Sequence, residues 1–150
     1  MDAHTYNVNA TWMDGRTGSA EASNVPVPVF FSAPPEFGGT EGLWTPEHLL
    51  VLAANSCLMS TLVALAEHNG LTLIGYRADA EGRLEKVPGQ GYRFTEIVIR
   101  PLVTVQSEDD FALAEKLLAK AEKLCIVANA LSVPVRVDAR IEIVATVTVG

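Results

Sequence analysis

The 150-residue sequence predicts a single α+β domain, residues 1–150, in which strands surround one long buried helix. Three observations support this class. Residues 49–66 form an uncharged run of helical length, segments of alternating apolar and polar residues lie on both sides of it, and a later segment repeats apolar residues at helical spacing. The resulting order of strands, helix, hairpin, helix and strand is typical of α+β proteins.

The N-terminal region predicts short strands joined by turns. Apolar and polar residues alternate from Tyr6 to Trp12, and Asp14-Gly15 marks a tight turn. The segment 25–31 is extended, and its prolines place it at an edge or outside the centre of a sheet. A loop rich in proline and glycine, residues 33–44, leads into the long helix.

Residues 46–68 predict one helix of roughly 34 Å at 1.5 Å per residue. Thr45 suits the N-cap, Pro46 suits the first helical position, and Asn69-Gly70 is a C-terminal stop signal. The apolar run is long enough for a membrane span, but it contains Asn and Ser, and the sequence has no second run. We therefore expect a buried core helix and no membrane partner.

The second half predicts a hairpin, a helix and a last strand. Two long strands, about 71–86 and 91–105, are joined by a turn at 88–91. Ser107 resembles a helix cap, and apolar residues then repeat at helical spacing, which predicts a helix over about 108–125 that can extend toward 130. Strict alternation from 133 to 143 predicts a strand with one wet face.

Charge and cysteine content exclude several classes of function. A formal net charge of -7 argues against nucleic-acid binding, which needs a basic surface. The N-terminus has no basic region followed by an apolar run, so we expect a cytoplasmic protein. In that compartment its two cysteines are reduced, catalytic or buried rather than a structural disulfide. No histidine has metal-ligand spacing to a cysteine, so we expect no metal.

Cys57, in the middle of the apolar helix, raises a chemical question. A free cysteine taken alone is most often an inert core thiol. The thiolate is the reactive form, and apolar burial raises the pKa of a thiol, so a reactive Cys57 requires a nearby cation, polar donors, or both. Arg16 is the candidate cation, although an arginine in a turn is most often solvated.

Three segments resemble the OsmC/Ohr family of thiol peroxidases. TPEHLLVLAANSCL is similar to the family helix in which a cysteine follows a glutamate by ten residues, here Glu47 and Cys57. AEKLCIVANAL resembles the segment of the second cysteine, here Cys125, and DGRTG resembles the turn with the active-site arginine, here Arg16. The sequence departs from the family at Ile126, where proline is frequent.

The resemblance implies an OsmC-like fold, with antiparallel sheets packed on the central helix in an intertwined homodimer. It also implies a peroxidase that reduces organic hydroperoxides. Cys57 becomes a sulfenic acid, Cys125 condenses with it to a disulfide, and an external dithiol reduces the disulfide without any bound cofactor. Arg16 favours the thiolate and Glu47 holds Arg16. The alternative is a non-catalytic OsmC-like dimer that binds a small apolar ligand.

Helix geometry constrains this site. Glu47 and Cys57 are ten residues apart, which separates them by about 15 Å along one helix. Either Arg16 spans that gap or the glutamate comes from another copy of the chain, which favours a homodimer with composite sites. Phe37 and Trp44, beside the helix start, are candidates for lining a peroxide pocket.

Overall fold

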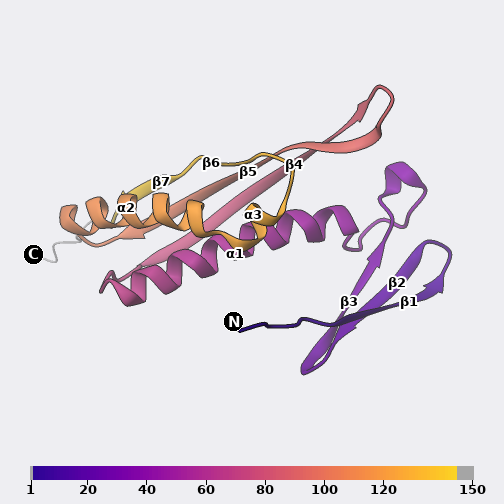
Figure 1. The fold of residues 1–150 in the computed structure, drawn as a ribbon, viewed down its shortest axis with the longest axis horizontal. Helices are drawn as coiled ribbons and strands as arrows, with labels where there is room; N and C mark the ends of the chain where they lie inside the picture. Colours follow the sequence, from indigo (N-terminus) through magenta and orange to yellow (C-terminus); the bar gives the residue numbers. More distant parts are fainter. Residues whose placement is uncertain (1, 145–150) are drawn as a thin grey trace, which may run out of the picture. The chain divides into compact units, whose positions relative to one another are not determined.

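Two separate sheets organise the chain, one in residues 1–50 and one in residues 51–150. The computed structural model describes residues 2–144. Helix α1 (Pro46–His68) begins in the first unit and continues through the second (Figure 1). The single domain expected across residues 1–150 stays a prediction.

The first unit is a three-stranded antiparallel meander. Strands β1 (Val8–Asp14), β2 (Thr17–Ala22) and β3 (Val25–Ser32) pair in the order β1-β2-β3. The turn after β1 needs Gly15, whose φ is 53°. As its prolines predict, β3 lies at an edge of the sheet. The following loop contains a short 3-10 turn, η1 (Pro35–Phe37).

The second unit is built on a long hairpin. Strands β4 (Gly75–Val87) and β5 (Gly91–Val105) are antiparallel, and glycines 89 and 91 have positive φ in the turn between them. Two short strands, β6 (Val135–Val137) and β7 (Arg140–Ile143), pair parallel with β5. The resemblance implied antiparallel sheets; the hairpin is antiparallel, and β6 and β7 make this sheet mixed.

The last strand is also interrupted, whereas the alternation of residues 133–143 predicted one continuous strand. Ile99 pairs with Val137, and Leu102 pairs with Arg140, so the break lies opposite residues 100–101 of β5. Pro101 has no N–H and cannot donate to a neighbouring strand. The missing donor explains why the ladder stops and then resumes.

The helix ends agree with the sequence signals in most places. The hydroxyl of Thr45 accepts the N–H of His48 at 3.1 Å, so Thr45 caps α1. Helix α2 (Glu108–Leu124) is capped by Ser107, whose hydroxyl accepts the N–H of Asp110 at 3.2 Å. Helix α2 does not continue toward residue 130, because Cys125 adopts extended backbone with ψ 107°; a separate helix, α3 (Ile126–Ala130), follows.

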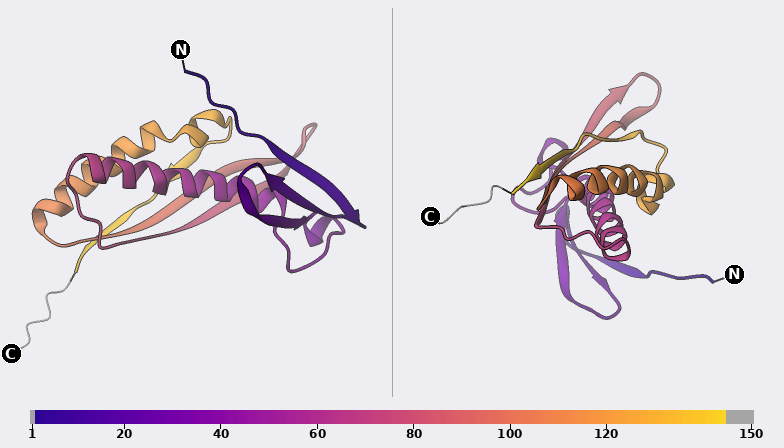
Figure 2. Two further views of the ribbon diagram at one scale, coloured as in Figure 1. Left: turned by 90° about the horizontal axis from the view of Figure 1, so that it is seen from below. Right: turned by 90° about the vertical axis from the view of Figure 1, so that its left-hand side faces the viewer.

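The core of the second unit lies between one face of the sheet and the helices. Both α1 and α2 lie on the same face of the sheet (Figures 1 and 2). Buried residues come from α1, β5 and α2: Ala54, Leu58, Leu62, Ala66, Ile97, Ile99, Val103, Val105, Ala114, Leu117, Leu118 and Ala121. A side chain at Gly82 of β4 would place its Cβ 2.5 Å from Val51 Cγ2, so helix and sheet approach closely there.

Helix α1 is only partly buried, whereas the sequence predicted a buried central helix. Leu52, Met59 and Val63 on another face are 41%, 41% and 39% exposed. The length and composition of α1 also suit a membrane span, a test that core helices of soluble proteins pass as well. The interior amide of Asn55 donates to the carbonyl of Ala78 at 3.0 Å, which ties α1 to β4.

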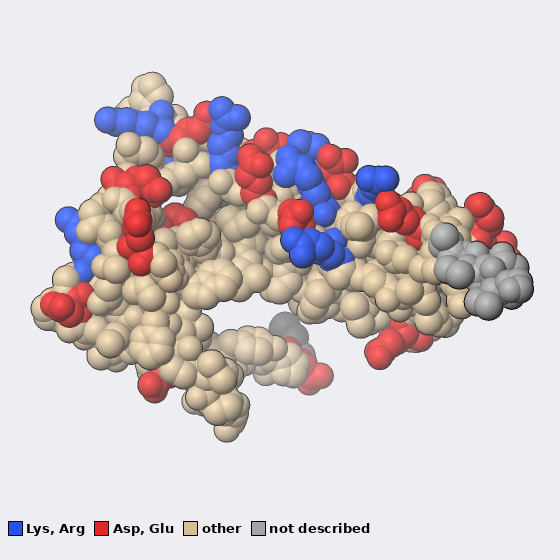
Figure 3. Space-filling model, turned by 180° about the vertical axis from the view of Figure 1, so that it is seen from behind, with Lys and Arg blue, Asp and Glu red and all other residues tan. Residues whose placement is uncertain are grey.

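The outer face of the second sheet is polar. Figure 3 shows basic and acidic side chains interspersed on the surface of the molecule. The ion pairs of this sheet join Arg77 to Asp79, Arg83 to Glu85, Arg100 to Glu81, Arg136 to Glu96, and Arg140 to Glu142. These side chains are 42% to 80% exposed, so each pair contributes at most about 1 kcal/mol to stability.

Candidate active site

Both cysteines belong to the second unit and come from different helices. Cys57 lies in the middle of α1 and is partly buried, and Cys125 lies at the junction of α2 and α3, where it is 2% exposed. Both are free thiols. The extended backbone at Cys125 ends α2 and points the first N–H groups of α3 into this region. Residues 68 positions apart in sequence thus meet at one place.

Hydrogen bonds to the sulfur of Cys57 favour its thiolate. Burial raises the pKa of the Cys57 thiol, but polar groups oppose it: the backbone N–H of Val127, the Cys125 thiol, the backbone N–H of Ile126, and Thr61, whose hydroxyl donates to the carbonyl of Cys57 at 2.8 Å. Together the donors hold the pKa of Cys57 below the ordinary thiol value. A reactive Cys57 requires such an environment, and polar donors supply it here.

Cys125 has the opposite tendency. Burial raises the pKa of the Cys125 thiol, and backbone groups of Ala128 and Val127 only partly offset that effect. The hydrogen bond to Cys57 and the negative charge of that sulfur raise the pKa of Cys125 further. The pair therefore consists of one sulfur that favours the thiolate and one that retains its proton and donates it.

Tyr76 of β4 lies close enough to interact with the second sulfur. Burial raises the pKa of Tyr76 to about 12, and the charge of Cys125 adds to this shift. Its hydroxyl oxygen is buried and has no hydrogen-bond partner among residues 2–144. The phenol is therefore neutral at physiological pH.

The arrangement can support nucleophilic chemistry at sulfur. A lowered pKa increases the fraction of the nucleophilic thiolate at Cys57, and a second thiol that interacts with it is a suitable partner for a disulfide. Within the described part of the chain, no group of three His, Cys, Asp or Glu residues is placed to hold a metal ion.

Arg16, in the first unit, is bound to the loop that follows β3. Its Nη1 donates to the carbonyl of Phe37 at 2.6 Å, and its guanidinium lies against Gly38, whose φ is 85°. A Cβ at Gly38 would lie 3.2 Å from Arg16 Cζ, so a glycine allows this close approach. Among the ion pairs of residues 2–144, none joins Arg16 to Glu47.

Glu47 and Trp44 lie at the start of α1. One carboxylate oxygen of Glu47, Oε2, is buried and has no hydrogen-bond partner in the described residues. The indole of Trp44 is about half exposed, at 50%, and meets the ring of His48 edge-on with centroids 6.1 Å apart. The pocket roles of Phe37 and Trp44, and the action of Arg16 and Glu47 on Cys57, stay predictions.

Sequence reasoning identified both sulfurs but missed most of the groups around them. Thr61 follows Cys57 by one helical turn, so its spacing was a usable signal. The N–H groups of Ile126 and Val127 become donors only because the helix breaks at Cys125. The sequence contains no signal that Tyr76 lies near Cys125.

Known proteins resemble this chain over most of its length. A model of the family described as "OsmC-like protein" matches residues 39–140. The sequence is 32% identical over 136 residues to "uncharacterized protein YmaD" of Bacillus subtilis strain 168, which covers 87% of this chain and 89% of that protein.

Solved structures share the fold. An OsmC-like protein of unknown function, VCA0330 from Vibrio cholerae, has a TM-score of 0.83 at 22% identity, covering 92% of this chain and 100% of that one. An organic hydroperoxide resistance protein OsmC from Legionella pneumophila has a TM-score of 0.73 at 24% identity, covering 96% and 100%. These likenesses support the α+β class and the OsmC-like fold predicted from the sequence.

Proposed function

We propose, from the premise that this chain belongs to the OsmC-like protein family, that it is a thiol peroxidase reducing organic hydroperoxides. The observation that carries the proposal is the hydrogen-bonded pair of unequal thiols, Cys57 and Cys125. Similar structures include organic hydroperoxide resistance proteins from Legionella pneumophila and Elizabethkingia anophelis.

The reaction proceeds in three balanced steps. The Cys57 thiolate attacks the distal peroxide oxygen, the O–O bond breaks, and the alkoxide takes a proton and leaves as an alcohol, so that Cys57 becomes a sulfenic acid. The Cys125 thiol then attacks that sulfur, and water leaves as the disulfide forms. An external dithiol finally transfers two electrons and two protons, which restores both thiols. The chain needs no bound cofactor for this cycle.

Arg16 and Glu47 complete the site in this proposal. The guanidinium orients the peroxide and favours the thiolate, and Glu47 holds the guanidinium. The buried, unpartnered Oε2 of Glu47 supports a cation that arrives when the site is assembled. Phe37 and Trp44 form an apolar pocket wall, which favours a hydroperoxide with an alkyl or aryl body.

A homodimer is part of the proposal. Leu52, Met59 and Val63 follow one another at spacings of seven and four residues, so they form an exposed apolar stripe on α1. A second copy covers this stripe and supplies Glu47 to the Cys57 of its neighbour. We expect Val63→Glu to yield monomers in sedimentation velocity, whereas Lys120→Glu, on exposed α2, leaves the dimer intact; a dimeric Val63→Glu contradicts this interface.

Peroxide-dependent disulfide formation tests the activity. We expect cumene hydroperoxide to join Cys57 and Cys125, seen by mass spectrometry of non-reduced peptides, in a protein that acts in the reducing cytoplasm. Cys57→Ser abolishes peroxide consumption, and Cys125→Ser accumulates a sulfenic acid at Cys57. If both variants consume the peroxide at the rate of the parent, the proposed cysteine peroxidase is wrong, and the alternative is a non-catalytic dimer that binds a small apolar ligand.

Mixed dimers test the composite site. Neither Glu47→Ala nor Cys57→Ser homodimers should turn over peroxide at the parent rate. Dimers formed from the two variant chains regain one intact site if Glu47 and Cys57 act from different copies. Absence of any regained activity places both residues in one copy and contradicts the composite arrangement.

A further inference from the structure

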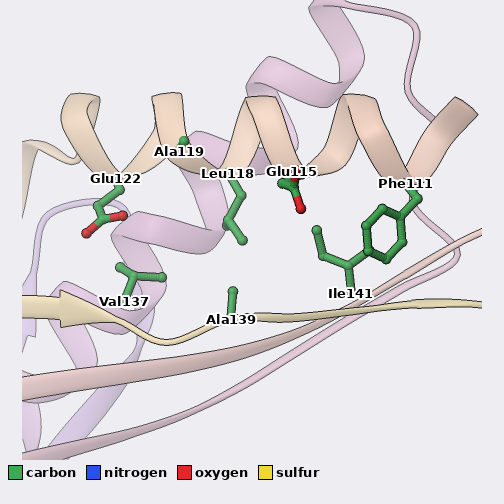
Figure 4. Close-up of a pocket in the computed structure, with 8 residues that line it drawn as sticks. All are labelled: Phe111, Glu115, Leu118, Ala119, Glu122, Val137, Ala139 and Ile141. Atoms are coloured by element: carbon green, nitrogen blue, oxygen red, sulfur yellow. The ribbon is translucent and has the colours of Figure 1, made fainter.

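A groove between α2 and the last strands lies outside the peroxide site. It has a volume of about 280 Å³ and lies between α2 and the segment from β6 to β7 (Figure 4). Phe111 of α2 points across it toward Ile141, and Leu118 of α2 points toward Ala139, so its interior is apolar. Glu115 and Glu122 supply its charged groups, and no ion pair of the described residues involves either carboxylate.

A smaller hollow adjoins this groove and reaches the second cysteine. It has a volume of about 20 Å³, room for about one water molecule. Glu122 and Val137 line both spaces, so the two spaces meet at these side chains. Of the two cysteines, Cys125 lines the small hollow and Cys57 does not.

That placement suits thiol–disulfide exchange at Cys125. A thiolate attacks a disulfide sulfur along the extension of the S–S bond, from the side opposite the sulfur that leaves. Once Cys57 and Cys125 are joined, a nucleophile in the hollow meets Cys125 rather than Cys57, because only Cys125 lines it. The hollow has room for about one water molecule, so entry of a thiol requires the exposed Glu122 side chain to rotate away.

The relative quality of the two sulfurs as leaving groups also favours attack on Cys125. In an exchange reaction the sulfur whose thiol has the lower pKa leaves faster. Donors hold the pKa of Cys57 below its ordinary value, whereas burial raises the pKa of Cys125. Attack on Cys125 therefore expels the better leaving group, Cys57, into the hydrogen bonds that stabilise its thiolate.

We propose that the reductant is a small dithiol without negative charge that enters the α2–β7 groove and attacks Cys125 of the disulfide. This inference rests on one part of the proposed function, the formation of the Cys57–Cys125 disulfide. The apolar lining accepts a carbon chain, and Glu115 and Glu122 repel anionic thiols. The first thiolate forms a mixed disulfide with Cys125 and releases the Cys57 thiolate. The second thiol then closes the reductant disulfide, and its proton passes to Cys125.

The attacked sulfur is identified by trapping. The disulfide is prepared with diamide, so that it does not depend on peroxide turnover, and is treated briefly with 2-mercaptoethanol. The reaction is then quenched with N-ethylmaleimide. We expect mercaptoethanol on Cys125 and maleimide on Cys57 by mass spectrometry. Mercaptoethanol on Cys57 overturns the inference, and failure of diamide to join the two cysteines overturns the proposed function with it.

Filling the groove tests the route. Ala119 lines the groove and is exposed, so Ala119→Phe fills space without disturbing the core. We expect reduction of the oxidised protein by dithiothreitol to slow at least tenfold, with diamide oxidation within twofold of the parent. Ala112→Phe, exposed two turns earlier on α2 and outside the groove lining, keeps the parent rate. Equal reduction rates in both variants overturn the route.

Charge provides an independent measurement. Dimercaptosuccinate, an anionic dithiol, should reduce the parent more slowly than dithiothreitol. Replacing Glu115 and Glu122 together by Gln should bring the two rates several-fold closer. An unchanged ratio shows that the reductant does not pass these carboxylates and contradicts the groove as its route.

Discussion

The thiol of Cys125 donates its hydrogen bond to the sulfur of Cys57, and the direction of that bond sets the chemistry of the pair. It helps to lower the pKa of Cys57 and to raise that of Cys125. As pH rises, Cys57 therefore loses its proton before Cys125 does. This inequality supports the proposal that Cys57 is the nucleophile.

The first prediction concerns the pH dependence of alkylation. The thiolate is the reacting form, so a lowered pKa lets Cys57 react with iodoacetamide at lower pH than an ordinary thiol. Cys125→Ala removes one donor, which raises the pKa of Cys57 and moves the rate–pH curve to higher pH. Cys125→Ser retains an O–H donor and should shift the curve less. Coincident curves for the parent and Cys125→Ala would show that this donor is unimportant.

The second prediction concerns Tyr76. Its buried hydroxyl has no partner within residues 2–144, and an unsatisfied buried polar group typically costs about 1–3 kcal/mol. Tyr76→Phe should therefore leave the free energy of unfolding unchanged or raise it by about 1 kcal/mol, measured in urea. Tyr6→Phe, at a position 90% exposed, is the control and should have no effect. A clear loss of stability in Tyr76→Phe means that the hydroxyl has a partner.

The third prediction concerns the start of α2. Ser107 accepts the N–H of Asp110, and loss of an N-cap side chain costs about 1 kcal/mol. Ser107→Ala should lower the free energy of unfolding by that amount, whereas Ser107→Asp preserves an acceptor and most of the stability. If Ala and Asp at this position are equivalent in urea unfolding, the cap does not stabilise the helix.

The fourth prediction concerns the contact of α1 with β4. A Cβ at Gly82 would lie 2.5 Å from Val51 Cγ2, whereas a Cβ at Gly75 would meet nothing closer than 3.7 Å. Gly82→Ala should cost roughly 1–3 kcal/mol, as overpacking does, and Gly75→Ala should be tolerated. Thermal unfolding of both variants measures the difference, and equal midpoints would mean that α1 moves away without cost.

Much of the fold was predictable because its signals are local. Thr45, Pro46 and Asn69-Gly70 predicted the bounds of α1, and the glycines at 89 and 91 predicted the hairpin. The break in the last strand was not predictable from alternation, because its cause, Pro101, lies on a neighbouring strand. The pairing of residues 135–143 with β5 determined that this strand is divided into β6 and β7.

The candidate site also has a part that was predictable from the sequence and a part that was not. Two cysteines in matching contexts were sufficient to select both sulfurs from the sequence. The donors around Cys57 were not, because the N–H groups of Ile126 and Val127 face it only after Cys125 interrupts the helix. Burial of Tyr76 beside Cys125 likewise depends on how β4 packs.

Pro101 has an effect beyond the strand that it interrupts. Where the ladder lapses, Ala139 lies between β6 and β7 and lines the α2–β7 groove (Figure 4). Pro101 lacks the amide proton that would continue the ladder, and the segment that contains Ala139 is therefore free to line the groove. If the groove admits the reductant as proposed, Pro101 influences the reduction of the disulfide through the shape of this recess.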